Sequence, residues 1–218
     1  MRWHEINQHI RGRSRRGWPV NVHIIGGLFL KATSSLVGAG QGIVVRCAKR
    51  RTDHEVELAV VIGRTASRVS RSEALSYVAG YSIGLDISIR GSEDRSFRKS
   101  PDSYSVLGPW LVTADEIPDP SALDLQITVN GQVRQQSNTK YMILGVAELI
   151  EMASAFYTLQ PGDLLFTGTP EGVSPIEAGD HIVATIDRIG SMTVVTRADA
   201  QRPASAARRQ HACIEGQR

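Results

Sequence analysis

Apolar and polar residues follow short, regular patterns along most of this chain. Residues 58–62 form a continuous apolar run that ends at Gly63, which is typical of a strand buried on both faces. Apolar residues alternate with polar ones over 125–129, and Asn130-Gly131 follows. This pattern predicts a hairpin with a two-residue turn, with the return strand passing through Val133.

The pattern changes to a helical period in two places. The first predicted helix is capped by Ser72, runs for about two turns, and has an apolar face formed by Ala74, Leu75, Val78 and Ala79. The second has an apolar face formed by Val146, Leu149, Ile150, Ala153 and Phe156. Pro161-Gly162-Asp163 ends this unit.

Further strands are expected at residues 164–166, 181–187 and 191–196, the last two joined by a turn at 188–190. Strands therefore dominate and short helices interrupt them. The pattern predicts a β-rich, mixed α+β fold without internal repeats.

Charge is distributed unevenly over the 218 residues. Residues 1–51 contain 10 Lys and Arg but one acid, whereas residues 52–196 contain 10 basic and 19 acidic residues. Residues 1–27 show no clear period and residues 197–218 form a basic tail, so the patterned part of the chain lies between them, at 28–196. The sequence pI of about 9.1 comes from the two ends, so we expect no nucleic-acid partner.

Composition places the chain among globular proteins, with 41% hydrophobic and 22% charged residues. No apolar run approaches the roughly 20 residues that span a bilayer, and no signal-peptide core follows Met1. The two cysteines, Cys47 and Cys213, are far apart in sequence and form no disulfide framework. We expect a cytoplasmic protein without a membrane partner.

Acidic residues stand where two predicted strands meet polar sequence. Glu55 and Glu57 are two residues apart, which on a strand places both carboxylates on one face about 7 Å apart. Asp86 ends the apolar stretch 81–85. Three carboxylates without clustered His or Cys favour a hard cation, Mg²⁺ or Mn²⁺. The alternative is that Glu55 and Glu57 form the solvated face of an edge strand.

Two further features can each be interpreted as functional or as ordinary surface structure. Lys99 follows Asp86 by thirteen residues, and it either stabilises negative charge on a substrate or lies in a solvated loop. The segment 167–172 (TGTPEG) follows a predicted strand. Its backbone N–H groups and hydroxyls can receive an anion, or the segment is an ordinary turn.

Taken together, these segments resemble the fumarylacetoacetate hydrolase family, in its compact single-domain branch of acylpyruvate hydrolases, oxaloacetate decarboxylases and 2-hydroxyhepta-2,4-diene-1,7-dioate isomerases. The resemblance covers about residues 28–196, which it implies are the catalytic domain, and it leaves residues 1–27 as a divergent N-terminal segment that is either an altered lid or disordered. The matching segments are 29–38, 54–64, 77–88, 99–110, 124–135 and 164–173.

The resemblance implies the family's fold, a roll of mixed sheets with short helices like the C-terminal domain of fumarylacetoacetate hydrolase, usually in a homodimer. It implies a divalent metal, Mg²⁺ or Mn²⁺, on Glu55, Glu57 and Asp86, and a small-molecule 2-oxo acid as substrate. Lys99 matches the family's active-site lysine. Gly168 and Thr169 match the loop that contacts the substrate carboxylate.

The chain departs from the family pattern at two places. Members that cleave C–C bonds carry a His and, three residues later, a Glu that activate water, whereas His9 is followed at that spacing by Gly12. After Asp86 the family commonly has A-R-D-x-Q. Here Arg90 is retained, while Gly91 and Glu93 replace the Asp and Gln.

These observations leave several functional hypotheses. The first is a Mg²⁺-dependent hydrolase or lyase of 2-oxo (β-diketo) acids, with His9 and Lys99 as catalytic residues and Arg90, Glu93, Gly168 and Thr169 as substrate-binding residues. The second is an oxaloacetate decarboxylase or keto–enol isomerase, reactions that need no activated water. The third is an inactive family member that binds metal.

Overall fold

The computed structural model describes residues 3–6 and 27–199. The strands are β1 (Trp3–Ile6), β2 (Leu28–Lys31), β3 (Leu36–Gly38), β4 (Ile43–Val45), β5 (Thr52–His54), β6 (Val56–Ile62), β7 (Val78–Asp86), β8 (Ser88–Ile89), β9 (Ser105–Thr113), β10 (Asp124–Val129), β11 (Gln132–Asn138), β12 (Leu164–Phe166), β13 (Ser174–Pro175), β14 (His181–Ile186) and β15 (Gly190–Ala198). The α-helices are α1 (Arg95–Lys99) and α2 (Val146–Phe156). Short 3-10 helices are η1 (Thr33–Ser35), η2 (Ala39–Gln41), η3 (Ala74–Tyr77), η4 (Pro120–Ala122) and η5 (Thr139–Tyr141).

A seven-stranded mixed sheet has the strand order β2-β1-β12-β6-β7-β9-β3. Its centre is β6, which pairs antiparallel with β12 on one side and with β7 on the other. Six of the seven β6 residues are buried, as the continuous apolar run predicts for a central strand covered on both faces. β1 lies within the segment 1–27 and pairs with both β2 and β12.

A five-stranded sheet in the order β11-β10-β14-β15-β4 forms a second layer. Its β10–β11 hairpin turns at Asn130 and Gly131, both with positive φ (51° and 78°), which the predicted two-residue turn requires. The pairing register shifts between Ile127 and Thr128, so that Arg134 is an extra residue on β11. Such a bulge changes the direction of the side chains that follow it.

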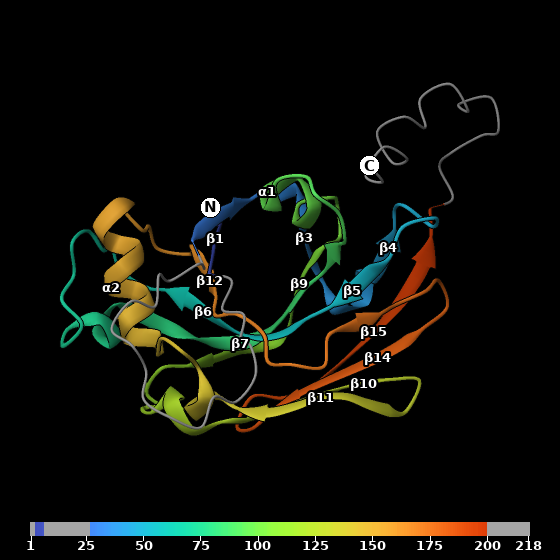
Figure 1. Ribbon diagram of the computed structural model, residues 1–218. Coiled ribbons are helices and arrows are strands. Elements are labelled where there is room, and N and C mark those ends of the chain that lie inside the picture. The colour runs from blue at the N-terminus through green and yellow to red at the C-terminus, as the bar shows by residue number, and fades with distance from the viewer. Residues whose placement is uncertain (1–2, 7–26, 200–218) are drawn as a thin grey trace, which may run out of the picture.

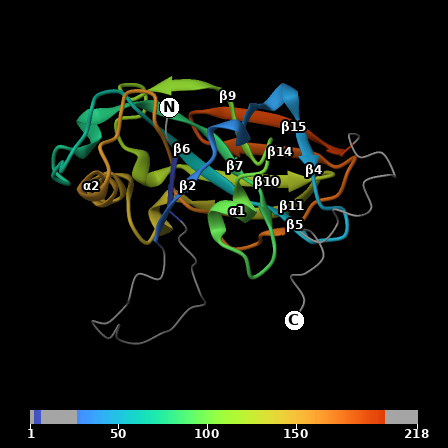
Figure 2. The same cartoon turned by 90° about the horizontal axis from the view of Figure 1, so that it is seen from above.

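The second sheet lies against the central strands of the seven-stranded sheet. In Figure 1, β10, β11 and β14 run below β6 and β7, whereas α1 lies above them. Helix α2 lies at one end of the molecule and β4 toward the other, in both the view of Figure 1 and the view from above in Figure 2. The start of β6 and the end of β7 therefore lie between the second sheet and α1.

The structure confirms the predicted β-rich fold and most of its elements. The hairpin, the second helix and the strands predicted at 164–166, 181–187 and 191–196 are present as β10–β11, α2, β12, β14 and β15. No helix in the described ranges is both long and apolar enough to cross a membrane.

The prediction of a two-turn helix after Ser72 is wrong. Only η3 forms there, with Glu73 rather than Ser72 at its N-cap position. Val78 already belongs to β7 and pairs with Ile62, and the Gly63 N–H donates to the Tyr77 carbonyl at 2.7 Å. Pairing with the buried strand β6 outweighs the local helical period, since tertiary contacts override weak propensities.

Candidate metal centre

Glu55, Glu57 and Asp86 come together at the start of β6 and the end of β7. The two strands pair antiparallel, and the Asp86 N–H donates to the Glu55 carbonyl at 2.9 Å. One carboxylate oxygen from each residue lies within 4.8 Å of the others. The three residues are only 2%, 1% and 0% exposed.

This burial excludes the reading of Glu55 and Glu57 as the solvated face of an edge strand. β6 has neighbours on both sides, so an acid on its inner face can be retained only with a positive charge nearby. The oxygen-only donor set is that of a hard cation such as Mg²⁺ or Mn²⁺. The residues therefore fit a divalent metal.

Two buried lysines contact the same carboxylates. Lys99 ends α1, and its Nζ donates to Glu55 Oε2 at 2.7 Å and to Asp86 Oδ2. Lys31 ends β2, and its Nζ donates to Asp86 Oδ1 at 2.5 Å and to the Tyr104 carbonyl at 3.0 Å. Lys99 is 1% exposed, which excludes its reading as a residue of a solvated loop.

The helix that carries Lys99 begins for a local reason. The Asp94 carboxylate accepts the Ser96 N–H at 2.7 Å, which is the side-chain cap that starts an α-helix. One turn later, Lys99 bonds the carboxylates of the site, whereas its neighbour Arg98 bonds the carbonyls of Glu93 and Ile89. The short helix α1 thus serves to place one ammonium group.

Arg90 connects the carboxylate cluster to a second buried acid. Its Nη2 donates to Glu55 Oε1 at 3.0 Å, and its Nε donates to Asp53 Oδ2 at 2.6 Å. Burial acts to raise the pKa of Asp53, but hydrogen bonds from Arg51 and Arg90 outweigh it and hold the pKa below its usual value. Ionised Asp53 therefore fixes Arg90 beside Glu55.

The loop after β12 lies against the same strand. The Gly168 N–H donates to Glu57 Oε2 at 2.7 Å, and Gly168 has a φ of 92°. The hydroxyls of Thr167 and Thr169 donate to the carbonyls of Leu58 and Val56 at 3.0 and 2.9 Å. These bonds place the loop directly beside the carboxylate cluster. The segment is therefore not an isolated surface turn.

Gln135 joins this loop to β6 from the second sheet. Its Nε2 donates to Thr169 Oγ1 at 2.8 Å and to the Pro170 carbonyl at 2.7 Å. Its Oε1 accepts from the Val56 N–H and from His54 Nδ1, both at 3.1 Å. Burial lowers the pKa of His54 below its usual value, against the opposing effect of the Gln135 hydrogen bond.

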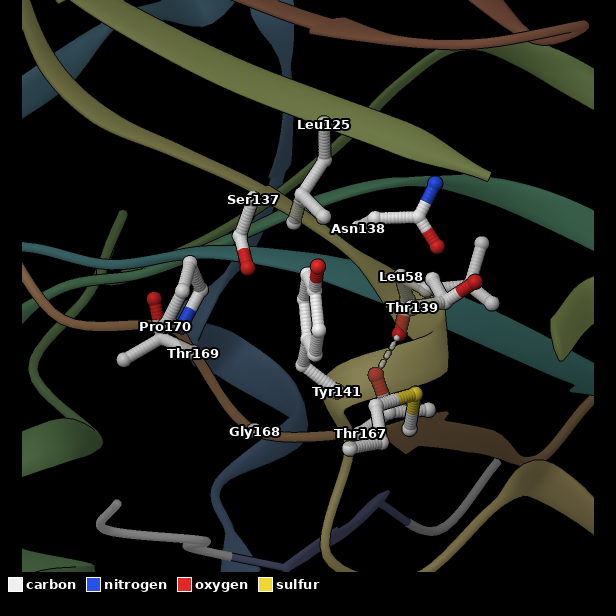
Figure 3. A pocket seen from close by; sticks show the side chains of 11 residues that line it. Leu58, Leu125, Ser137, Asn138, Thr139, Tyr141, Thr167, Gly168, Thr169 and Pro170 are labelled. Atoms are coloured by element: carbon white, nitrogen blue, oxygen red, sulfur yellow. Dashed lines mark hydrogen bonds between the residues drawn. The ribbon is translucent and has the colours of Figure 1, made fainter. Parts of the chain in front are cut away.

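A small pocket lies behind the loop (Figure 3). It holds about 30 Å³, and Leu58, Tyr141 and the loop residues Thr167 to Pro170 line it. Leu58 follows Glu57 on β6, and successive side chains of a strand point to opposite faces. Leu58 therefore reaches the pocket from the face of β6 opposite to Glu57.

The structure brings together most of the residues singled out in the sequence. Glu55, Glu57, Asp86, Lys99, Arg90, Gly168 and Thr169 lie in one connected cluster. Glu93 pairs instead with Arg50, through oxygen–nitrogen distances of 2.6 and 2.8 Å. These hydrogen bonds lower the pKa of Glu93 to about 2. His9 lies outside the described residues.

Three buried residues of the cluster were not identified from the sequence: Lys31, Asp53 and Gln135. Lys31 ends the apolar run 28–30 and lies within a segment that matches the family, which was a usable signal. Asp53 precedes the two glutamates by two and four residues on the same side of the chain. Gln135 also ends a matching segment, 124–135, but nothing in the sequence signalled its inward direction, which depends on the bulge in β11.

Comparison with known proteins agrees with this geometry. The family model described as fumarylacetoacetate (FAA) hydrolase C-terminal matches residues 6–196. A maleylpyruvate hydrolase from Aquipseudomonas alcaligenes is 61% identical over 171 residues, which are 78% of this chain and 60% of that protein. The chain therefore spans less than two thirds of the length of this relative.

Solved structures of similar proteins have the same fold. The maleylpyruvate hydrolase from Sphingobium sp. SYK-6, in complex with manganese(II) ion and pyruvate, superposes with a TM-score of 0.79 at 38% identity, covering 90% of this chain and 70% of that one. The 5-carboxymethyl-2-hydroxymuconate delta-isomerase from Mycobacterium smegmatis gives 0.81 at 34%, covering 92% and 80%. With a family model matched over most of its length, the chain belongs to the fumarylacetoacetate hydrolase family.

Proposed function

We propose that this protein is a divalent-metal-dependent hydrolase of acylpyruvates, and that maleylpyruvate is the first substrate to test. The observation that carries the proposal is the buried cluster of Glu55, Glu57 and Asp86 with Lys99 on its edge and the Gly168 loop beside it. Relatives named maleylpyruvate hydrolase support the choice of substrate.

Glu55, Glu57 and Asp86 would hold the metal, either Mg²⁺ or Mn²⁺. When bound, the cation supplies Lewis acidity toward the oxygens of a 2-oxo acid and the enolate that develops from it. A relative in complex with manganese(II) and pyruvate supports Mn²⁺ as the first metal to use.

The chain's own residues would bind and orient the substrate. The Lys99 ammonium lies next to the cluster and would stabilise the negative charge that develops on the substrate oxygen. Gly168 and Thr169 would receive the substrate carboxylate, as the family resemblance implies. Arg90 would hold Glu55 in place and would lie next to the substrate. Glu93 would lie along the same side of the site.

The reaction requires one water. Its oxygen adds to the acyl carbon, the bond between that carbon and the methylene of the pyruvyl part breaks, and the electron pair passes to the developing pyruvate enolate. A proton then converts the enolate to pyruvate, and maleate is the second product. His9 is the proposed base for the water.

The test is a metal-dependent assay of the full chain. We expect maleylpyruvate to be cleaved to maleate and pyruvate with Mn²⁺ or Mg²⁺ and not after metal removal. Glu57→Gln is expected to lower both Mn²⁺ affinity and turnover by at least about 100-fold, since it removes a charged ligand. Turnover and metal affinity that survive this substitution would exclude the proposed site.

A second function, oxaloacetate decarboxylation or keto–enol isomerisation, is favoured by one observation. Gly12 stands where the family's water-activating Glu is expected, and neither reaction needs an activated water. Assays of maleylpyruvate cleavage and oxaloacetate decarboxylation in one metal-loaded preparation separate the two functions. Absence of turnover with every 2-oxo acid would indicate an inactive, metal-binding member instead.

The homodimer implied by the family resemblance is also part of the proposal. Large apolar side chains on the described surface, Trp110 at 60% and Phe156 at 79% exposure, are available for such a contact. Sedimentation equilibrium of the full chain tests this directly. A mass of one chain at all concentrations would exclude the dimer.

A further inference from the structure

Gln135 has four hydrogen-bond partners, and their chemistry fixes the orientation of its side-chain amide. The Val56 N–H can only donate, so the atom facing it is Oε1. The Pro170 carbonyl can only accept, so the atom facing it is Nε2. The same orientation makes His54 Nδ1 a donor to Oε1, and His54 Nε2 is hydrogen-bonded to Ser174 Oγ at 2.8 Å. Every hydrogen-bonding group of this amide is therefore matched.

These bonds join three separate parts of the chain. Val56 lies between the two glutamates of the carboxylate cluster, and Thr169 and Pro170 belong to the loop that follows β12. The Thr169 hydroxyl donates to the Val56 carbonyl at 2.9 Å and accepts from Gln135 Nε2 at 2.8 Å. Gln135 is 1% exposed, so water cannot replace these contacts readily.

The bulge in β11 makes this arrangement possible. Arg134 is the extra residue, and both it and Gln136 are exposed while Gln135 between them is buried. The loop packs closely on the bulge, since a Cβ at Gly172 would lie 2.2 Å from the Arg134 carbonyl oxygen. The hairpin and the loop are thus in close contact, and the Gln135 side chain extends from the hairpin to β6 at this place.

We propose that Gln135 is a positioning residue that holds the loop 167–170 in the orientation that receives the substrate carboxylate. The inference rests on the proposed function in that the loop's ligand is the carboxylate of a 2-oxo acid. Gln135 acts more on substrate binding than on metal binding, because the pairing of β6 with β7 places the backbone that carries the carboxylate cluster.

The test compares Gln135→Glu with the matched control Gln136→Glu. The Gln135 variant keeps the acceptor toward Val56 but replaces the donor toward Thr169 and Pro170 by an acceptor, whereas Gln136 is exposed. In the Mn²⁺-loaded full chain we expect Gln135→Glu to weaken pyruvate binding and raise KM by at least about tenfold. Mn²⁺ affinity should stay within about threefold of the unmodified protein.

A second variant approaches the same bond from the loop. Thr169→Val removes the hydroxyl that accepts from Gln135 Nε2 and donates to the Val56 carbonyl, while Gln135 keeps its other partners. It should also weaken pyruvate binding. The double variant should lose less than the sum of the two single variants, because both substitutions remove the bond between Gln135 and Thr169. Additive losses would overturn the coupling.

Hydrogen exchange of the loop amides separates this inference from the proposed function. We expect exchange of the amides of residues 167–169 to be at least about tenfold faster in Gln135→Glu, with α2 unchanged. Unchanged loop exchange, or equal losses of Mn²⁺ and pyruvate affinity, would overturn the positioning role. If the unmodified protein binds no pyruvate, the proposed function fails, and the exchange rates alone decide whether Gln135 holds the loop.

Discussion

The ammonium groups of Lys31 and Lys99 lie where they partly neutralise the three buried carboxylates. A divalent cation on the same oxygens would be repelled by both lysines at short range. Metal binding and the Lys99 contacts to Glu55 and Asp86 therefore compete, and the lysine is expected to shift toward the substrate when the cluster is loaded. This competition gives Lys99 two separable effects, one on metal affinity and one on turnover.

Lys99→Met tests both effects. Removing the ammonium should lower kcat by at least about 100-fold, because a charge that stabilises the developing enolate is lost. Mn²⁺ affinity should be unchanged or higher, since a competing cation is gone. Steady-state kinetics and Mn²⁺ titration measure the two effects, with exposed Lys49→Met as the control. A parallel loss of metal affinity would contradict the competition.

The Arg50–Glu93 ion pair makes a pH-dependent contribution to stability. The folded pKa of Glu93, about 2, lies below the ordinary value of 4.5. The contribution is therefore complete above about pH 4.5 and is lost as the pH falls toward 2. Because the Glu93 side chain is 28% exposed, it should amount to no more than about 1 kcal/mol.

The measurement is the free energy of unfolding of Glu93→Gln against the unmodified protein from pH 3 to pH 7. We expect a deficit near neutral pH that shrinks on acidification. Glu177→Gln, at an exposed glutamate with no ion pair recorded in the described part of the chain, should show no such trend. A deficit that is constant with pH would contradict the ion pair as its cause.

At the scale of elements, the β10–β11 hairpin determines where the second sheet meets the site. Its turn at Asn130-Gly131 sets the pairing register, and the bulge at Arg134 then directs Gln135 inward. A change at the turn should thus affect the stability of the hairpin through backbone conformation alone, since a Cβ at Gly131 would meet nothing within 4 Å.

Gly131→Ala is expected to destabilise the protein by about 1 kcal/mol, because φ at this position is +78° and side chains disfavour that conformation. Gly40→Ala is the matched control, as Gly40 also has open space but no positive φ. Its effect should stay within about 0.5 kcal/mol. Denaturant unfolding measures both, and equal effects would contradict the assignment to backbone strain.

At the scale of the whole molecule, a cation in the cluster would join the central strands of the main sheet. A ligand that binds only the folded state stabilises it by about 2.7 kcal/mol when present at 100 times its Kd. For a chain of this size we therefore expect Mn²⁺ to raise the Tm by about 5 to 10 °C. Chelation should reverse the shift, and Glu57→Gln should abolish it. An equal shift in Glu57→Gln would indicate binding elsewhere.

Local pattern determined much of this protein. The sequence predicted three features correctly: the buried strand at 58–62, the Asn130-Gly131 turn and the apolar face of α2. Each depends on the periodicity of apolar residues or on turn chemistry, and both are set by neighbours in sequence. The helix predicted after Ser72 does not form, because Val78 pairs with β6. Spacing alone also left Glu55 and Glu57 as surface residues or ligands, and the family resemblance was needed to favour ligands.

The tertiary structure decided which further side chains, beyond those singled out in the sequence, join the site around the carboxylates. Lys31, Asp53 and Gln135 are ordinary polar residues in the sequence, and they become parts of the site through strands that pair over long separations. Their burial makes each contact matter, because a buried polar group must find its partner inside the protein. The sequence by itself thus determined most of the strands and helices and identified the three acids. The packing of the sheets determined which side chains hold those acids and the loop beside them.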